Sequence, residues 1–259
     1  MMQSDEQRAR RLRNLHLVAT IFMLAHTIII GVIPLKSRLP QTVGFPLRLE
    51  EGPIGIVSVR QVYSLNPTAL ICVFTGLAAL DHFVVTIFAF LKPALWQNLL
   101  FVDKKMPFRW IEYSFSASIM SVLIAGIAGI YDIHTLFLIA CLTGICNLSG
   151  LIIEMLPKDQ VKAAKSVFWL ASLAVIVSWL PILCYFFEDT DGIPGFVYAA
   201  FLLTAVMYVL FGANNYIASF TSIYDYARAE MIYVILSFTA KTFLAYDVWG
   251  GYKAAEEDM

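Results

Sequence analysis

Long apolar segments separated by short polar ones constrain this chain more than any other feature. About 20 consecutive apolar residues are needed for a helix to cross the hydrocarbon core of a bilayer. Segments of this kind cover approximately residues 15–34, 68–92, 107–131, 133–156, 164–187, 193–220 and 228–249. Only 14% of the residues are charged, against about 25% in soluble domains. The sequence therefore predicts one all-α domain, residues 1–259, with seven helices in a lipid bilayer.

Composition argues against several other classes of protein. The net charge of -1 does not favour a nucleic-acid partner. The cysteines, Cys72, Cys141, Cys146 and Cys184, all lie in apolar segments without the C-x-x-C spacing of a metal site. We interpret them as buried thiols and expect no bound metal.

The loop between the first two apolar segments, residues 35–67, is long. Leu47 and Leu49 alternate with polar neighbours, Glu51-Gly52-Pro53 follows, and Ile54, Ile56, Val57 and Val59 come next. This pattern predicts a small β-hairpin around a Gly-Pro turn. An irregular loop is the alternative.

The distribution of lysine and arginine predicts the orientation of the chain. Cytoplasmic flanks of membrane helices are enriched in both residues. One side of the predicted bundle would hold Arg8, Arg10, Arg11, Arg13, Lys92, Lys104, Lys105, Arg109, Lys158, Lys162, Lys165 and Arg228. The other side would hold only Lys36, Arg38, Arg48, Arg60 and Lys253. We therefore expect a cytoplasmic N-terminus and an extracellular C-terminus in the cell membrane, opposite to G-protein-coupled receptors.

Two ionisable residues are expected within the membrane, where such residues are costly and usually functional. Lys241 lies deep in the last apolar segment, and Glu112 lies a turn or two from the inner end of the third. At a helical rise of about 1.5 Å per residue, Lys241 would lie deeper by roughly 10 Å. A desolvated lysine amine can attack an aldehyde and form a Schiff base, and a nearby carboxylate would stabilise its protonated form. A structural Lys–Glu ion pair is the alternative. Arg109, one turn before Glu112, could pair with that carboxylate or extend to the lipid headgroups.

A second polar group is predicted in the cytoplasmic half. His26 and His82 would lie at similar depth on adjacent helices, which suggests a shared hydrated cavity and a proton-accepting role. Asp81 precedes His82, and successive helical residues point about 100° apart, so we expect Asp81 to face elsewhere. Two hydrogen-bonded core histidines are the alternative. Zinc binding would need further ligands.

Three segments resemble the heliorhodopsin family: FRWIEYS (108–114), PGFVY (194–198) and S-x-x-A-K, which ends at Lys241. The resemblance covers nearly the whole chain and implies a rhodopsin-like bundle that binds all-trans retinal on Lys241 with Glu112 as counter-ion. It also implies a homodimer whose first-loop hairpin contacts the partner. The family's retinal pocket corresponds here to Met120, Trp169, Tyr208 and Ser237.

The chain departs from the family pattern at two positions. Tyr208 stands where phenylalanine is expected, which could change the absorbed colour. One member of the family's inner histidine pair corresponds to His82. The position of the other member, on the first helix, is occupied here by Met23.

The resemblance favours a light sensor with a slow photocycle and an unidentified cytoplasmic signalling partner. Microbial pumps have a carboxylate one turn before the retinal lysine, where this chain has Ser237. Outward pumps also have a carboxylate further along the third helix, where Leu123 stands here. We expect neither a pump nor an enzyme. A light-gated passive proton channel is the main alternative, and a retinal-free structural protein is another.

Overall fold

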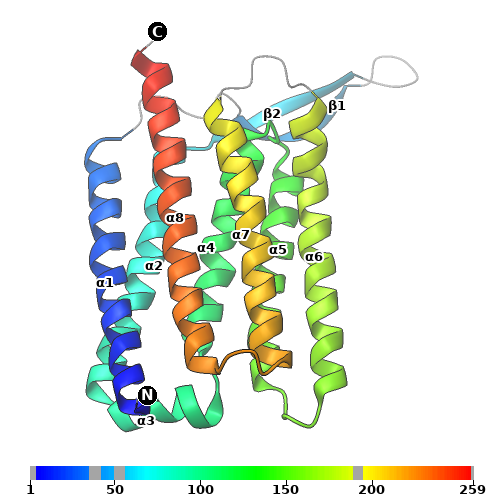
Figure 1. The fold of residues 1–259 in the computed structure, drawn as a ribbon. Coiled ribbons are helices and arrows are strands. Elements are labelled where there is room, and N and C mark those ends of the chain that lie inside the picture. The colour runs from blue at the N-terminus through cyan, green and yellow to red at the C-terminus, as the bar shows by residue number, and fades with distance from the viewer. Residues whose placement is uncertain (1–3, 35–41, 50–55, 189–194, 258–259) are drawn as a thin grey trace.

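The computed structural model describes residues 4–34, 42–49, 56–188 and 195–257 (Figure 1). Within these residues, 7 helices are long and apolar enough to cross a membrane. They are α1 (Asp5–Val32), α2 (Pro67–Leu91), α4 (Pro107–Ile127), α5 (Ile133–Met155), α6 (Val161–Glu188), α7 (Gly195–Phe220) and α8 (Tyr226–Glu257). The protein is therefore a multi-pass integral membrane protein, as its apolar segments predicted.

The first helix starts earlier than the apolar pattern indicated, at Asp5 rather than near residue 15. The Ser4 side chain accepts a hydrogen bond from the Gln7 amide, and the acidic residues Asp5 and Glu6 occupy the first turn. Both features stabilise a helix N-terminus. The basic segment before the apolar residues thus belongs to the helix, and this changes the depth of every residue counted from its start.

A short connection between α2 and α4 was not predicted. It consists of α3 (Pro93–Gln97) and a π-helical turn, η1 (Asn98–Asp103), and ends at Lys104 with a left-handed φ of 52°. Trp96 is buried there, and its indole N–H donates to the Ala9 carbonyl oxygen at 3.3 Å. The connection lies at the end of the bundle where α1 begins (Figure 1), which we call the N-terminal face.

The first loop contains two antiparallel strands, β1 (Thr42–Leu49) and β2 (Ile56–Ser64). Their register pairs Phe45 with Arg60 and shifts between Val43 and Gly44. The strands lie at the opposite end from the N-terminus (Figure 1), and β1 lies near α5. The turn predicted at Glu51-Gly52-Pro53 lies outside the described residues.

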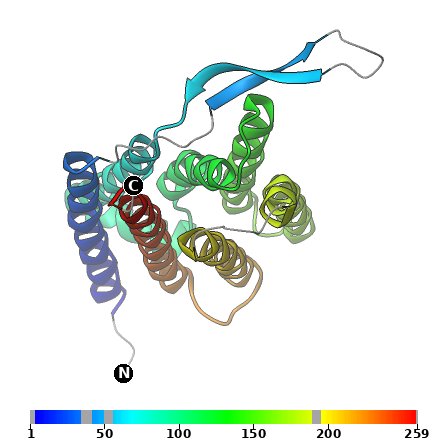
Figure 2. The same ribbon diagram turned by 90° about the horizontal axis from the view of Figure 1, so that it is seen from above.

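The helices pack around a core formed mainly by α2, α4, α5, α7 and α8, seen end-on in Figure 2. Large apolar side chains also cover the outer faces, including Phe115, Leu170 and Val209. In water such a surface would be a strongly exposed apolar patch. It is the surface expected of a bundle whose solvent is lipid.

Candidate functional site

Lys241 and Glu112 form a buried ion pair between α8 and α4. The lysine Nζ lies 2.7 Å and 2.9 Å from the two carboxylate oxygens, and it also donates to Ser237 Oγ at 3.0 Å. Lys241 is 3% exposed and Glu112 is 8% exposed. The predicted gap in depth between them is closed because helical side chains lean toward the helix N-terminus. Sequence reasoning thus identified the central pair of the site.

An aromatic layer separates this ion pair from the N-terminal face. Lys241 Nζ lies 5.0 Å from the centre of the Tyr113 ring, in the range of a cation–π contact. The Tyr113 hydroxyl donates to the Tyr233 carbonyl oxygen at 3.1 Å. Trp110 packs edge-on against Tyr233, with ring centroids 5.6 Å apart. These rings keep the lysine amine in an environment of low polarity.

A cavity of about 300 Å³ extends from Lys241 between α4, α5, α6 and α7. Its lining is mostly apolar and includes Met120, Tyr208 and Ser237, as predicted. A mostly apolar pocket with a few convergent polar groups is typical of a site for an organic ligand. The reactive amine at one end makes this cavity suitable for an elongated apolar aldehyde.

Three polar atoms on this lining have no hydrogen-bond partner among the described residues. They are Trp110 Nε1, Ser116 Oγ and Tyr233 Oη. Buried polar groups are nearly always hydrogen-bonded. Unpaired polar atoms on the cavity wall are expected where a ligand or ordered water supplies the missing hydrogen bonds.

Tyr208 joins a hydroxyl cluster on the same wall. Its hydroxyl lies 2.7 Å from Ser121 Oγ, which accepts a further hydrogen bond from Thr143 Oγ1 at 3.2 Å. The Tyr208 ring also packs against Trp179, with centroids 5.4 Å apart. The hydroxyl that departs from the family pattern is therefore held in a fixed position beside the cavity.

The prediction that Trp169 lines the pocket was wrong. Its side chain is 62% exposed on the outer face of α6, and its neighbour Phe168 lines the cavity instead. Successive helical residues point about 100° apart, so only one of the two can face inward. Both the lipid face and the cavity face of α6 are apolar, which left the sequence pattern without a way to distinguish them.

The partner of His82 is His16 rather than His26, which was predicted to share a cavity with His82. His82 Nδ1 lies 3.0 Å from His16 Nδ1, and both rings are buried. His26 instead contacts α8, with its Nδ1 3.4 Å from Thr242 Oγ1 and its ring packed on Tyr246. The earlier start of α1 explains the error because it places His16, rather than His26, at the depth of His82.

Asp81 lies closer to this histidine pair than expected. Its Oδ2 is 3.7 Å from His82 Nδ1, although the two residues are adjacent on α2. The expectation that they face different surroundings is therefore corrected. His16, His82 and Asp81 therefore form one polar group. Among the described residues, no group of three or more His, Cys, Asp or Glu side chains is suited to a metal ion.

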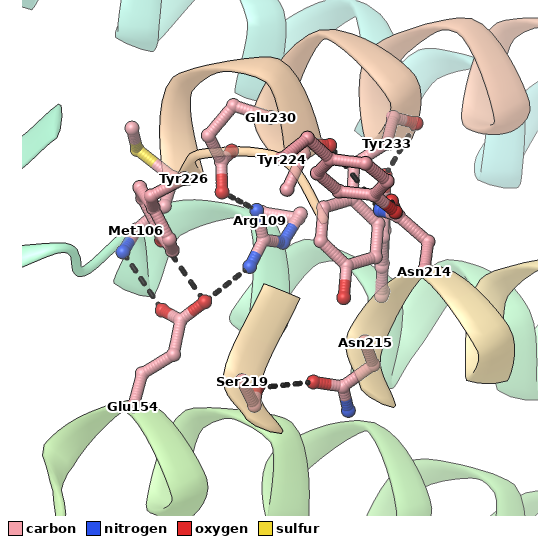
Figure 3. Close-up of polar contacts among 12 residues, drawn as sticks. Met106, Arg109, Glu154, Asn214, Asn215, Ser219, Tyr224, Tyr226, Glu230 and Tyr233 are labelled. Carbon is pink, nitrogen blue, oxygen red and sulfur yellow. Dashed lines mark hydrogen bonds and ion pairs between the residues drawn. The ribbon is translucent and has the colours of Figure 1, made fainter. Parts of the chain in front are cut away.

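Arg109 neither pairs with Glu112 nor extends to the headgroups, so both predictions for it were wrong. Its guanidinium is buried and forms ion pairs with Glu154 on α5 and Glu230 on α8 (Figure 3). Sequence reasoning missed both carboxylates because each lies near a helix end, where solvation is the simpler interpretation. A signal in the sequence could have identified them. Arg109 lies within an apolar segment, where a charged side chain needs a partner, and both glutamates lie near the same predicted side of the membrane.

Seven membrane-spanning helices with a buried lysine on the last, ion-paired to a carboxylate on the third, define the rhodopsin class of membrane proteins. The chain belongs to the heliorhodopsin family, whose model, described as Heliorhodopsin, matches residues 12–252. A comparison with curated proteins gave no match.

Two solved structures share the fold. Thermophilic rhodopsin from Rubrobacter xylanophilus has a TM-score of 0.63 at 11% identity over 96% of both chains. Xanthorhodopsin, described as a light-driven ion pump with dual chromophore, has a TM-score of 0.67 at 10% identity, covering 97% of this chain and 96% of its own. At such low identity these likenesses show the fold alone.

Proposed function

We propose that this protein is a photoreceptor that binds retinal covalently through Lys241. The observation that carries the proposal is the buried Lys241 amine at one end of the apolar cavity, ion-paired to Glu112. All-trans retinal in this cavity would supply visible-light absorption and a double bond that isomerises. The orphaned polar atoms on the cavity wall and the apolar lining fit such a ligand.

The residues around Lys241 have distinct roles in this proposal. Glu112 provides the negative charge that stabilises a protonated nitrogen at the lysine, because opposite charges a few ångströms apart favour the charged form. Ser237 orients the nitrogen through its hydroxyl. Met120 and Tyr208 shape the cavity, and the aromatic layer limits access of water from the N-terminal face.

One turn before Lys241, this chain has Ser237 where microbial pumps have a carboxylate, and this difference favours a sensor over a pump. The proposed sensor has a slow photocycle, with the N-terminal face on the cytoplasmic side contacting a signalling partner and the C-terminus extracellular. We further propose a homodimer. A light-gated passive proton channel is the second candidate, and the buried group of His16, His82 and Asp81 favours it because these side chains could relay a proton.

An absorbance spectrum of the purified protein expressed with all-trans retinal tests the main proposal. We expect a visible band that hydroxylamine bleaches and that Lys241→Ala abolishes. Lys162→Ala, on the exposed start of α6, is the matched control and should keep the band. A parent protein without a visible band would refute the proposal and leave Lys241 and Glu112 as a structural ion pair. If the visible band is present, light-induced currents across a membrane would separate the channel from the sensor.

A further inference from the structure

A second buried ionic cluster lies at the N-terminal end of the bundle, on the far side of the aromatic layer from Lys241. Arg109 is its centre, and Figure 3 shows the guanidinium between Glu230 and Glu154. The Tyr226 hydroxyl and the Met106 amide each donate to a Glu154 oxygen at 2.9 Å. The arginine also lies over the Tyr233 ring, 3.9 Å from its centre. The cluster joins α4, α5 and α8.

The formal charges of this cluster do not balance. Arg109 is 5% exposed, Glu154 is 6% exposed and Glu230 is 1% exposed, so all three are removed from solvent. In the described part of the chain, the ion pairs of both carboxylates are with Arg109 alone. One positive charge therefore faces two negative ones. An uncompensated buried charge is strongly unfavourable because the protein interior does not replace its lost hydration, and a bound proton would remove it.

A route for that proton exists toward the N-terminal face. A cavity of about 70 Å³ is lined by Glu154, Tyr226, Ser219, Lys104 and Lys158. Its polar lining and its size are sufficient for water, which needs room for about one probe sphere and two or more polar partners. Both lysines are exposed, so the cavity lies between the buried carboxylate and bulk solvent.

We propose that the Arg109 cluster is a proton-binding site, in which Glu154 and Glu230 hold one proton between them and exchange it with solvent at the N-terminal face. Binding converts one carboxylate to a carboxylic acid, and the proton comes from water in the cavity. The cluster then carries no net charge. The proposal does not rest on retinal, because the ion pairs of this cluster and the Lys241–Glu112 ion pair have no residue in common.

Other charged and titratable groups face the cluster from the elements packed around it. They are Tyr113 on α4, Tyr226 and Tyr233 on α8, His16 on α1, on which Arg109 acts electrostatically, and Lys104 and Lys158 in the adjoining loops. Asn214 on α7 accepts a hydrogen bond from Tyr224 beside them. The tyrosines are neutral hydrogen-bonding groups at physiological pH, so they do not supply the missing positive charge. Lys104 and Lys158 are exposed, and the ion pairs of Glu154 and Glu230 among the described residues are with Arg109, so the lysine charges stay in solvent.

Infrared spectroscopy of the detergent-solubilised full-length protein tests the site. A protonated carboxylic acid has a carbonyl band distinct from carboxylate bands, and the band shifts when water is replaced by D₂O. We expect Glu154→Gln and Glu230→Gln each to remove the same band, because either variant leaves Arg109 with one carboxylate. Glu6→Gln, at an exposed position in α1, is the matched control. Asp81→Asn controls for other buried carboxyls.

The single variants should also melt close to the parent, whereas the Glu154→Gln, Glu230→Gln double variant should melt at a clearly lower temperature because Arg109 then lacks a counter-charge. A band that persists in both single variants would overturn the proposal. If the variants do not fold, the unmutated protein can be labelled with ¹³C-glutamate. A spectrum in which no carboxylic-acid band shifts with the label would also overturn the proposal. A normal visible band beside either negative result would leave the retinal proposal intact.

Discussion

Lys241 Nζ donates to both carboxylate oxygens of Glu112, at 2.7 Å and 2.9 Å, and to Ser237 Oγ at 3.0 Å. A protonated lysine has three N–H donors, so every donor of the amine has an acceptor. An imine nitrogen at the same position retains at most one N–H. Attachment of a chromophore would therefore free acceptors on Glu112 or Ser237, which a water molecule could then occupy.

Replacing Glu112 with Gln should move the visible band to longer wavelength and lower the proton affinity of the imine nitrogen. The carboxylate stabilises positive charge at that nitrogen, and each tenfold change in proton affinity corresponds to about 1.4 kcal/mol of lost interaction. Titration of the visible absorbance against pH measures both effects. Glu6→Gln is again the control. A variant with the spectrum and titration of the parent would remove Glu112 as counter-ion.

The sequence was sufficient to predict the helices and the Lys241–Glu112 pair because both follow from the cost of polarity in lipid. Apolar length identifies a spanning helix, and a lone lysine at mid-membrane requires an anion. The resemblance to heliorhodopsins added Met120, Tyr208 and Ser237, which line the cavity.

The errors arose where apolar patterning carries no directional information. Trp169 and Phe168 are both aromatic, and lipid and cavity are both apolar, so periodicity did not show which residue faces inward. His26 was misplaced because the polar start of α1, acidic in its first turn and basic in the turns after it, was excluded from the helix. The pairing of Arg109 was missed because Glu154 and Glu230 lie near helix ends, where apolar patterning does not separate a buried carboxylate from a solvated one.

The corrected histidine pair predicts energetic coupling between His16 and His82. Residues in direct contact show coupling of about 0.5–3 kcal/mol, whereas distant pairs are additive to within about 0.5 kcal/mol. Unfolding of the detergent-solubilised single variants His16→Ala and His82→Ala and of their double variant measures the coupling. The matched cycle of His26→Ala with His82→Ala should be additive, because His26 contacts Thr242 and Tyr246 instead. Coupling confined to the second cycle would contradict the structure.

Asp132, which lies between the spanning segments of α4 and α5, should stabilise α5 in a pH-dependent way. Its carboxylate accepts hydrogen bonds from the Thr135 amide at 2.8 Å and the Thr135 hydroxyl at 2.6 Å. Partial burial alone would raise the pKa of Asp132, but the hydrogen bonds from Thr135 and His134 outweigh it and lower the pKa. Asp132→Ala should cost about 1 kcal/mol at neutral pH, as for other N-cap residues.

The sign of the pH dependence follows from that lowered pKa. The extra stability is present above the unfolded-state pKa of about 3.9 and is lost as the pH falls through the lower folded-state value. Denaturation at neutral and strongly acid pH should therefore show the Asp132→Ala defect shrinking in acid. Asp132→Asn still caps the helix, so it should keep most of the stability at neutral pH. A defect of equal size at both pH values would exclude the charged cap.

Gly150 on α5 allows Trp110 to pack directly against the helix backbone, which places the indole between the cavity and Arg109. A Cβ at Gly150 would lie 2.3 Å from Trp110 Cζ3, so the ring would have to move. Alanine normally stabilises a helix interior by about 0.5–1 kcal/mol relative to glycine, whereas overpacking costs about 1–3 kcal/mol. The steric term should win, and Gly150→Ala should lower the melting temperature and displace Trp110. Gly250→Ala, where a Cβ meets nothing within 4 Å, should leave the melting temperature unchanged or raise it. Thermal unfolding with tryptophan fluorescence measures both effects, and a Gly150→Ala protein as stable as the Gly250→Ala control would show that the indole has room to shift.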